Sequence, residues 1–223
     1  MIFIKLTLFI KKNISHGANI FGCQVEISKK KSDFMNQIEK EVTSIFEETN
    51  ALLKGHFILR AGLRSGRFFQ CAQVCQHMDK VSRLAELLLL KVSFENFNTV
   101  VSPAMGGLVI GQEVARQAHA RFIFLEKIDD RLALRRNFSL NSSDRVLLVE
   151  DVVTKGGRVM EAIEIITNHE CILAGVTSLV DRSTEELDFG FPFEPLLKMQ
   201  FPTYSIEQLP KELASIPAVK PGS

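Results

Sequence analysis

The sequence of 223 residues predicts an α/β fold, with a mostly parallel twisted sheet, helices on both faces, and an N-terminal helix and hairpin. From Thr99 to Val180, short apolar runs alternate with helical patterns, as in a parallel sheet with helical crossovers. One of these runs, Val146–Val149, leads into the carboxylates Glu150 and Asp151 and then a glycine turn. Open α/β sheets bind ligands at this end of their strands.

Residues 1–32 are expected to be an extension outside the main fold, which then comprises residues 33–223. Met1–Lys12 is apolar, but a lysine interrupts it and it is too short to span a bilayer. It also lacks the charged start and the small-residue cleavage site of a signal peptide. An extra strand docked on the domain is the alternative interpretation.

The chain then continues with a helix and a hairpin. Apolar residues at helical spacing predict a helix over Asp33–Leu53, with Ser32 or Asp33 as its N-cap. Two short apolar runs around a Gly/Ser-rich turn predict a hairpin over Gly55–Cys71. The other expected elements are a helix at Val74–Val92, a strand at Thr99–Ser102, a helix to about Gln117, a strand at Arg121–Leu125, a polar loop to about Asn141, a strand at Val146–Val149, a helix at Arg158–Asn168, a strand at Ile172–Val180 and an edge strand at Leu196–Phe201 in a proline-rich tail.

Composition argues against two classes of partner. With 27 basic and 26 acidic residues the formal net charge is +1, which gives no support for nucleic-acid binding. No membrane partner is expected either, because the apolar N-terminus is short. The four cysteines match no zinc motif, so free thiols in a reducing cytoplasm are expected. A metal site at Cys71 and Cys75, which could share a helix face, is the weaker interpretation.

Glu150 and Asp151 stand at the expected carboxyl end of a buried strand. Strand alternation sends neighbouring side chains to opposite faces, which is a poor geometry for sharing one proton. At a strand end, however, both can reach vicinal hydroxyls of one ribose. The loop Thr154–Gly157 then opens a helix whose N–H groups attract a phosphate. A second glycine loop, Pro103–Gly107, favours one shared site over the alternatives of a surface acidic pair and a plain turn.

Val146–Arg158 resembles the phosphoribosyl-pyrophosphate (PRPP) motif of the type I phosphoribosyltransferases. Four further segments make the chain similar to the orotate phosphoribosyltransferases among them: Gly55–Cys71, Val101–Gly107, Phe124–Phe138 and Leu179–Ser183. The resemblance covers residues 33–182 and implies the fold of that family, with residues 33–71 as a hood. It also implies transfer of the phosphoribosyl group of PRPP to orotate, which yields orotidine 5′-monophosphate and pyrophosphate in pyrimidine synthesis.

The resemblance implies roles for individual residues. The acidic pair would hold the ribose hydroxyls, the following loop the 5-phosphate, and Arg182 the orotate carboxylate. The expected PRPP-binding residues are Glu150, Asp151, Val152, Val153, Thr154, Lys155, Gly156, Gly157, Arg158, Ala104, Met105 and Gly106. The expected orotate-binding residues are Thr154, Arg182, Arg60, Phe68 and Phe69, with core packing as the alternative for the two phenylalanines.

The polar stretch 126–141 resembles the mobile catalytic loop of the family, with Arg131, Arg135 and Arg136 as its charges. Lys127 and Asp151 are the expected catalytic residues. The transition state is sugar cation-like and expels pyrophosphate, so cationic side chains and Mg²⁺ stabilise the leaving group while a closed lid excludes water. The Mg²⁺ is expected to be carried by PRPP and not bound directly by the protein. In this family the loop reaches a neighbouring subunit, which implies a homodimer with shared active sites; a solvated surface loop is the alternative.

The chain departs from the family pattern in both loops. Lys155 and Arg158 stand where the family has threonine and serine, and Asp130 and Asn137 stand where relatives often have glycine. Ala61 stands where relatives often have serine. These changes are expected to alter efficiency more than fold or ligand class. A purine-type phosphoribosyltransferase is one alternative function, and a non-catalytic PRPP- or nucleotide-binding regulator is another, which the two loop cations motivate.

Overall fold

The computed structural model describes residues 20–59, 62–93 and 96–221. Its contacts divide the chain into two compact units, residues 1–40 and residues 41–223. The first nineteen residues of the expected extension lie outside the described residues, so the separate status of residues 1–32 stays a prediction.

The first described element is helix α2 (Ile20–Glu48), which is 29 residues long. Ser32 and Asp33 lie inside this helix, so the prediction that one of them caps it was wrong. A capping side chain contributes only about 1 kcal/mol, and the lysines at 29–31 are good helix formers, so the helix continues upstream of this signal. The helix also ends before the expected Leu53, which belongs to the next strand.

Four strands of the second unit form a small sheet in the order β10-β1-β2-β9. β1 (Leu52–Ile58) and β2 (Arg64–Phe69) pair antiparallel, which confirms the expected hairpin. Two short strands of the tail complete the sheet: β9 (Thr203–Tyr204) beside β2, and β10 (Ala218–Val219) parallel to β1. These two short strands were not predicted from the sequence.

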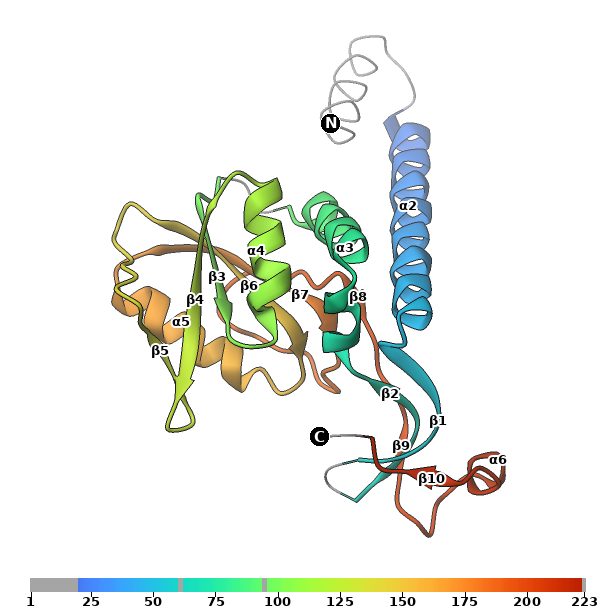
Figure 1. Cartoon of the computed structure of the whole chain (residues 1–223). Coiled ribbons are helices and arrows are strands. Elements are labelled where there is room, and N and C mark those ends of the chain that lie inside the picture. Colours follow the sequence, from blue (N-terminus) through green and yellow to red (C-terminus); the bar gives the residue numbers. More distant parts are fainter. Residues whose placement is uncertain (1–19, 60–61, 94–95, 222–223) are drawn as a thin grey trace. The chain divides into compact units, whose positions relative to one another are not determined.

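Six strands form the larger sheet, in the order β5-β4-β3-β6-β7-β8 (Figure 1). All neighbouring pairs are parallel except β4 and β5, so the predicted mostly parallel sheet is confirmed. No described helix is long and apolar enough to cross a membrane. The remaining elements of the unit are η1 (Cys71–Gln76), α3 (Met78–Lys91), β3 (Thr99–Pro103), α4 (Gly107–Gln117), β4 (Arg121–Ile128), β5 (Arg131–Leu134), β6 (Arg145–Val153), α5 (Gly157–Asn168), β7 (Ile172–Asp181), β8 (Leu197–Lys198) and α6 (Lys211–Ala214).

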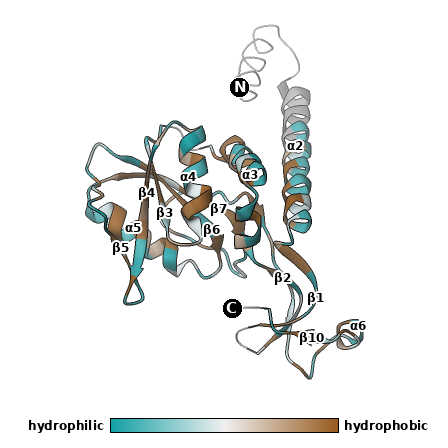
Figure 2. Cartoon of the chain, in the orientation of Figure 1, coloured by the Kyte–Doolittle hydropathy of each residue, from teal (hydrophilic) through white to brown (hydrophobic). Residues whose placement is uncertain are grey.

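Both faces of the larger sheet are covered by helices. Val101 of β3 belongs to a buried cluster with Val159 and Ile163 of α5. The next residue, Ser102, points to the other face, where a Cβ on Gly111 of α4 would lie 1.9 Å from its Oγ. Burial on both faces explains why the central strands in Figure 2 are apolar along their length.

The expected polar loop after β4 is in fact a hairpin. β4 continues to Ile128 and pairs antiparallel with β5, so the prediction of an irregular segment was wrong there. Leu132 is 8% exposed and Leu134 packs against the same core cluster, so alternate residues of β5 face the core. Four residues in a polar stretch are too few for a period of two to be recognised from sequence.

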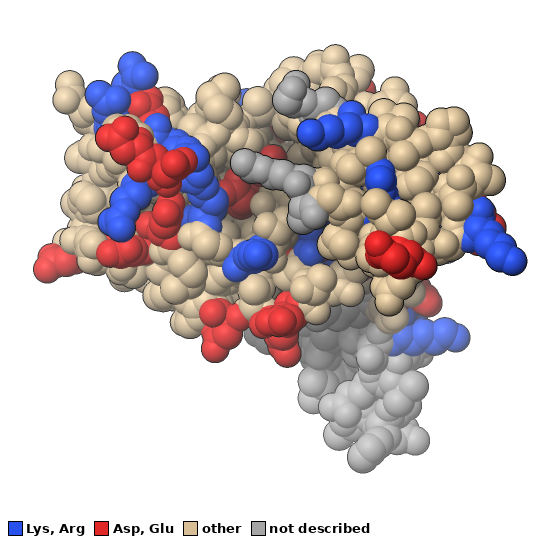
Figure 3. Space-filling view, turned by 90° about the horizontal axis from the view of Figure 1, so that it is seen from below, with Lys and Arg blue, Asp and Glu red and all other residues tan. Residues whose placement is uncertain are grey.

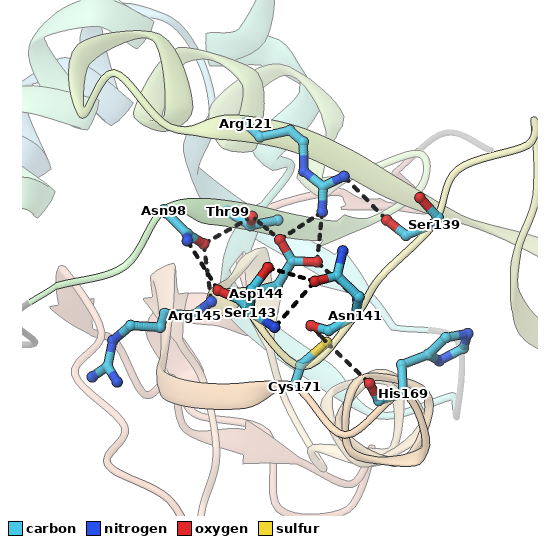
Figure 4. Close-up of polar contacts among 10 residues, drawn as sticks. All are labelled: Asn98, Thr99, Arg121, Ser139, Asn141, Ser143, Asp144, Arg145, His169 and Cys171. Carbon is cyan, nitrogen blue, oxygen red and sulfur yellow. Dashed lines mark hydrogen bonds and ion pairs between the residues drawn. The ribbon is translucent and has the colours of Figure 1, made fainter.

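A buried carboxylate joins three strands at the end of the larger sheet where β3, β4 and β6 begin (Figure 4). Asp144 is 5% exposed and accepts hydrogen bonds from Thr99 Oγ1 at 2.9 Å and from the Asn141 N–H at 2.9 Å. Arg121 Nη2 lies 2.7 Å from each of its oxygens. The network fixes the strand starts relative to one another.

Replacing Asp144 with alanine is expected to lower the free energy of unfolding by about 3 kcal/mol, because buried donors lose their acceptor and Arg121 loses its carboxylate partner. Urea denaturation measures this loss. The matched control is Asp188→Ala, whose exposed carboxylate accepts one N–H of Gly190 and whose loss should cost less than about 0.5 kcal/mol. Equal losses in the two variants would contradict a stabilising role for the network.

Candidate active site

Glu150 and Asp151 lie near the carboxyl end of β6 and open into two adjoining hollows. Glu150 lines the first hollow, of about 340 Å³, together with the turn Thr154–Gly157. Asp151 lines the second hollow, of about 480 Å³, together with Gly106. Val152 lines both, so the acidic pair lies where the two hollows meet.

The turn between β6 and α5 shapes the first hollow. Gly156 has φ +77°, and a Cβ there would lie 2.7 Å from the Phe189 ring, so a larger residue would require the ring to move. No side chain caps α5, which leaves the first amide groups of the helix for a ligand. Lys155 and Arg158 line the same hollow and add two positive charges to it.

The turn Pro103–Gly107 reaches the same acidic pair from β3. Its Ala104–Met105 peptide bond is cis. A Cβ on Gly106 would lie 2.5 Å from Oδ1 of Asp151, and one on Gly107 would lie 3.0 Å from the Val149 carbonyl oxygen. The structure therefore brings the two glycine loops together at Glu150 and Asp151, with backbone close to both carboxylates.

Burial raises the pKa of Glu150 to about 9, and the negative charge of Asp151 adds to this shift. Burial also raises the pKa of Asp151. Strand alternation predicted a poor geometry for sharing a proton, and the structure shows that each carboxyl group nevertheless shifts the pKa of the other. The Glu150 side chain folds back along the strand, where its Oε1 accepts the Asp151 N–H at 3.0 Å. At neutral pH the pair holds a proton and can both donate to and accept from ligand hydroxyls.

Arg182 directly follows β7. Its N–H donates to the Val153 carbonyl at 2.8 Å, which ties it to the end of β6. Its guanidinium lies 5.2 Å from the centroid of the Phe201 ring, and burial lowers its pKa. The Nε atom is buried and has no hydrogen-bond partner among the described residues. A desolvated guanidinium of this kind suits an anionic ligand.

The two phenylalanines of the hairpin differ in their contacts. Phe69 is 5% exposed, packs edge-to-face on Phe46 at 4.9 Å and lines the second hollow. Phe68 packs against Phe57 at 5.7 Å. These ring contacts fit core packing, which was the alternative interpretation for the two phenylalanines. Phe69 in addition lines the second hollow. Arg60, the remaining expected orotate contact, and its neighbour at position 61 lie outside the described residues.

The β4–β5 hairpin carries the expected catalytic lysine. Lys127 forms an ion pair with Asp130 at the tip, and Asp130 lines the first hollow of the same chain. Asp129 and Asp130 have φ +47° and +67°, the left-handed conformations of a two-residue turn that usually contains glycine. Figure 3, which views the molecule from below, shows acidic and basic side chains next to one another on its left side.

Two of the three expected lid arginines share one partner, Glu126. Arg136 Nε lies 2.6 Å from Glu126 Oε1, and Arg135 Nη1 lies 3.6 Å from Glu126 Oε2. Arg131 is exposed. Arg136 and Asn137 also have positive φ, so the glycine of relatives is replaced here by asparagine in a left-handed position.

Some residues that line the site were not among those predicted from the sequence. Asp130 and Glu161 place acidic groups in the first hollow, and Glu161 Oε2 lies 3.6 Å from Arg158 Nη1. The spacing of three residues between Arg158 and Glu161 on a helix was the available signal for that pair. Phe201, which lies under Arg182, gave no such signal because it is far away in sequence.

Comparison with known proteins identifies the family. Residues 72–193 match the family described as Phosphoribosyl transferase domain. The orotate phosphoribosyltransferases of Rhizorhabdus wittichii and Erythrobacter litoralis are 45% and 44% identical to the chain over 188 residues, which cover 83% of this chain and 96% and 97% of theirs. The crystal structure of orotate phosphoribosyltransferase from Aeropyrum pernix shares the fold, with a TM-score of 0.61 and 20% identity over 70% of this chain and 92% of that one.

The fold and the site together define a phosphoribosyltransferase. Within this class, the chain belongs to the orotate phosphoribosyltransferase family.

Proposed function

We propose that the chain transfers the 5-phosphoribosyl group from PRPP to orotate, giving orotidine 5′-monophosphate and pyrophosphate in pyrimidine synthesis. The observation that carries the proposal is the meeting of two glycine loops at the Glu150–Asp151 pair. Identity to orotate phosphoribosyltransferases over most of the chain supports orotate as the acceptor.

PRPP would lie across both hollows. The amide groups of Thr154–Gly157 and of the first turn of α5 would bind the 5-phosphate, with Lys155 and Arg158 beside them. Glu150 and Asp151 would hold the ribose hydroxyls, and the loop at Ala104, Met105 and Gly106 would bind the pyrophosphate. Placing the reacting atoms in one fixed geometry lowers the entropic part of the barrier.

Breaking the bond between C1 of the ribose and pyrophosphate leaves negative charge on the departing oxygen. Lys127 can neutralise this charge once its ion pair with Asp130 opens, and Arg131, Arg135 and Arg136 supply further positive charge on the hairpin. Mg²⁺ bound by PRPP would add positive charge at the pyrophosphate. The acidic pair offers the oxygen donors that Mg²⁺ prefers, and the described residues contain no cluster of three or more metal-binding side chains.

Orotate is already anionic at its carboxylate, and its ring nitrogen, which forms the new bond to C1, can be deprotonated, so the reaction needs no strong base. Arg182 would pair with this carboxylate, while Thr154, Arg60, Phe68 and Phe69 would surround the ring. A neutral purine would leave the buried guanidinium of Arg182 unpaired, which favours orotate over a purine as the acceptor.

We also propose a cytoplasmic homodimer in which the hairpin of one subunit completes the active site of the other. Support for the dimer comes from the family resemblance. Support for a reducing compartment comes from Cys71, Cys75 and Cys171, which are free thiols. Light scattering with size-exclusion chromatography measures the mass of the assembly, and a monomer that is fully active would contradict the shared site.

A single assay tests the proposed reaction. The purified protein is incubated with PRPP, Mg²⁺ and orotate, and the loss of orotate absorbance is followed. Turnover is expected with orotate and not with adenine or guanine. Turnover with a purine alone would overturn the choice of acceptor, and PRPP binding without any turnover would favour a regulator.

Asp130→Gly is expected to raise kcat/KM for PRPP by roughly three- to tenfold. The change removes an anion from the first hollow, where the 5-phosphate is proposed to bind, and frees Lys127 from its ion pair. Asp130→Asn separates charge from backbone strain, since asparagine keeps a side chain but tolerates a left-handed conformation. Similar gains in both variants at low ionic strength, shrinking as salt is added, would identify the charge as the cause. An unchanged kcat/KM in both would show that Asp130 does not act on the donor.

A further inference from the structure

Two cysteines face the site although the proposed reaction does not use them. Cys71 and Cys75 lie on η1 and line the second hollow with Asp151 and Gly106. Both are free thiols. Cys71 is 5% exposed, whereas Cys75 is half-buried, so Cys75 is the thiol that a reagent in the hollow can reach.

The two thiols have different chemical character. The Cys71 side chain lowers the pKa of Cys75, against the opposing effects of burial and of the charge of Asp151. The Cys75 side chain and then burial raise the pKa of Cys71. Because the thiolate is the reactive form of cysteine, Cys75 is the better nucleophile of the two as well as the more exposed.

We propose that Cys75 is a modification site that reacts with low-molecular-weight disulfides, and that the adduct blocks the PRPP site. The Cys75 thiolate attacks one sulfur of the disulfide RSSR, having given its proton to water. A Cys75–S–S–R mixed disulfide forms as the S–S bond of the reagent breaks, and the other half leaves as the thiolate RS⁻. A free thiol reverses the step by the same exchange.

The position of the adduct explains why it would block PRPP. The group attached to Cys75 would fill the second hollow, whose volume of about 480 Å³ is that of a small-molecule pocket. Asp151, Gly106 and Met105 line this hollow and are the residues proposed to hold the ribose and the pyrophosphate. The blocking step therefore rests on the proposed function, whereas the reaction at Cys75 does not.

The reaction at Cys75 is tested in the full chain carrying Cys23→Ser, a change that leaves Cys71, Cys75 and Cys171 as the cysteines to be compared. The reduced protein is incubated with glutathione disulfide, and labelling of each cysteine is followed by peptide mass spectrometry. Cys75 is expected to react at least about tenfold faster than Cys171, a cysteine that is 8% exposed and hydrogen-bonded to the Asn141 carbonyl oxygen. Equal rates at Cys75 and Cys171 would overturn the proposal.

The blocking step is tested by calorimetric titration with PRPP and Mg²⁺ before and after labelling. Labelled protein is expected to lose at least about 90% of its binding and to regain it with dithiothreitol, while Cys75→Ser is unaffected by the same treatment. Full PRPP binding by labelled protein would overturn the blocking step. Absence of PRPP binding before labelling would instead contradict the proposed function, and the labelling rates would still decide whether Cys75 is reactive.

Discussion

Replacing Arg182 with alanine is expected to lower kcat/KM for orotate by roughly 10²–10³-fold and to leave the affinity for PRPP within about threefold. The reason is the environment of the side chain. Its guanidinium is desolvated against the Phe201 ring, and its Nε has no partner among the described residues. An orotate carboxylate can supply the missing charge and hydrogen bonds, whereas PRPP is proposed to bind elsewhere.

Steady-state kinetics with each substrate varied in turn measure both effects. Arg67→Ala is the matched control, because Arg67 also lies over Phe201, at 5.9 Å, but is exposed; its loss should change kcat/KM by less than about threefold. Arg182→Lys keeps the charge without the bidentate fork and should fall between alanine and the native enzyme. Equal losses for orotate and PRPP in Arg182→Ala would remove Arg182 from the orotate site.

The sequence predicted the central part of the fold because its signals there are local. A buried apolar strand, a carboxylate pair and a Gly-Gly turn follow one another within Val146–Gly157, so strand, loop and helix could each be recognised. The second glycine loop, Pro103–Gly107, was recognised in the same way. In both loops, the conformation that the local sequence favours is also the one that the overall fold needs.

The missed features depend on contacts between residues distant in sequence. β5 exists because Leu132 meets the core, which its own polar neighbourhood does not reveal. β9 and β10 each pair through two residues with strands more than a hundred positions away, and such short segments carry no periodic signal. The two hollows also required the structure, because residues from separate segments of the chain line each of them.

Glu150→Gln is expected to stabilise the fold while reducing PRPP use, and the gain in stability should depend on pH. The pKa of Glu150 is raised to about 9 from an ordinary value of 4.5, chiefly by burial and then by the charge of Asp151. Below pH 4.5 the carboxyl is neutral in both the folded and the unfolded chain, so its titration has no cost. Above that pH the unfolded chain ionises while the folded chain keeps its proton, and the native fold is progressively penalised until the pH passes about 9.

The glutamine side chain does not ionise, so the gain in the free energy of unfolding from Glu150→Gln should grow by on the order of 3 kcal/mol between about pH 5 and pH 8. Urea denaturation of both proteins across this range measures the difference. Glu113→Gln is the matched control: hydrogen bonding to Arg116 lowers the pKa of Glu113 to about 2, so both states are ionised and the effect should be flat over the same range. A flat difference for Glu150→Gln would show that Glu150 is not held neutral in the empty site.

The same variant should lower kcat/KM for PRPP by roughly 10- to 100-fold, because the amide cannot become the anion that the ribose hydroxyls and their metal ion favour. A carboxylate kept in a buried pair at a cost in stability is typical of a site selected for ligand binding rather than for folding. Stabilisation at pH 8 together with this loss of activity would show that Glu150 serves ligand binding at a cost in stability. Stabilisation without loss of activity would instead leave Asp151 as the acidic residue that binds the ribose.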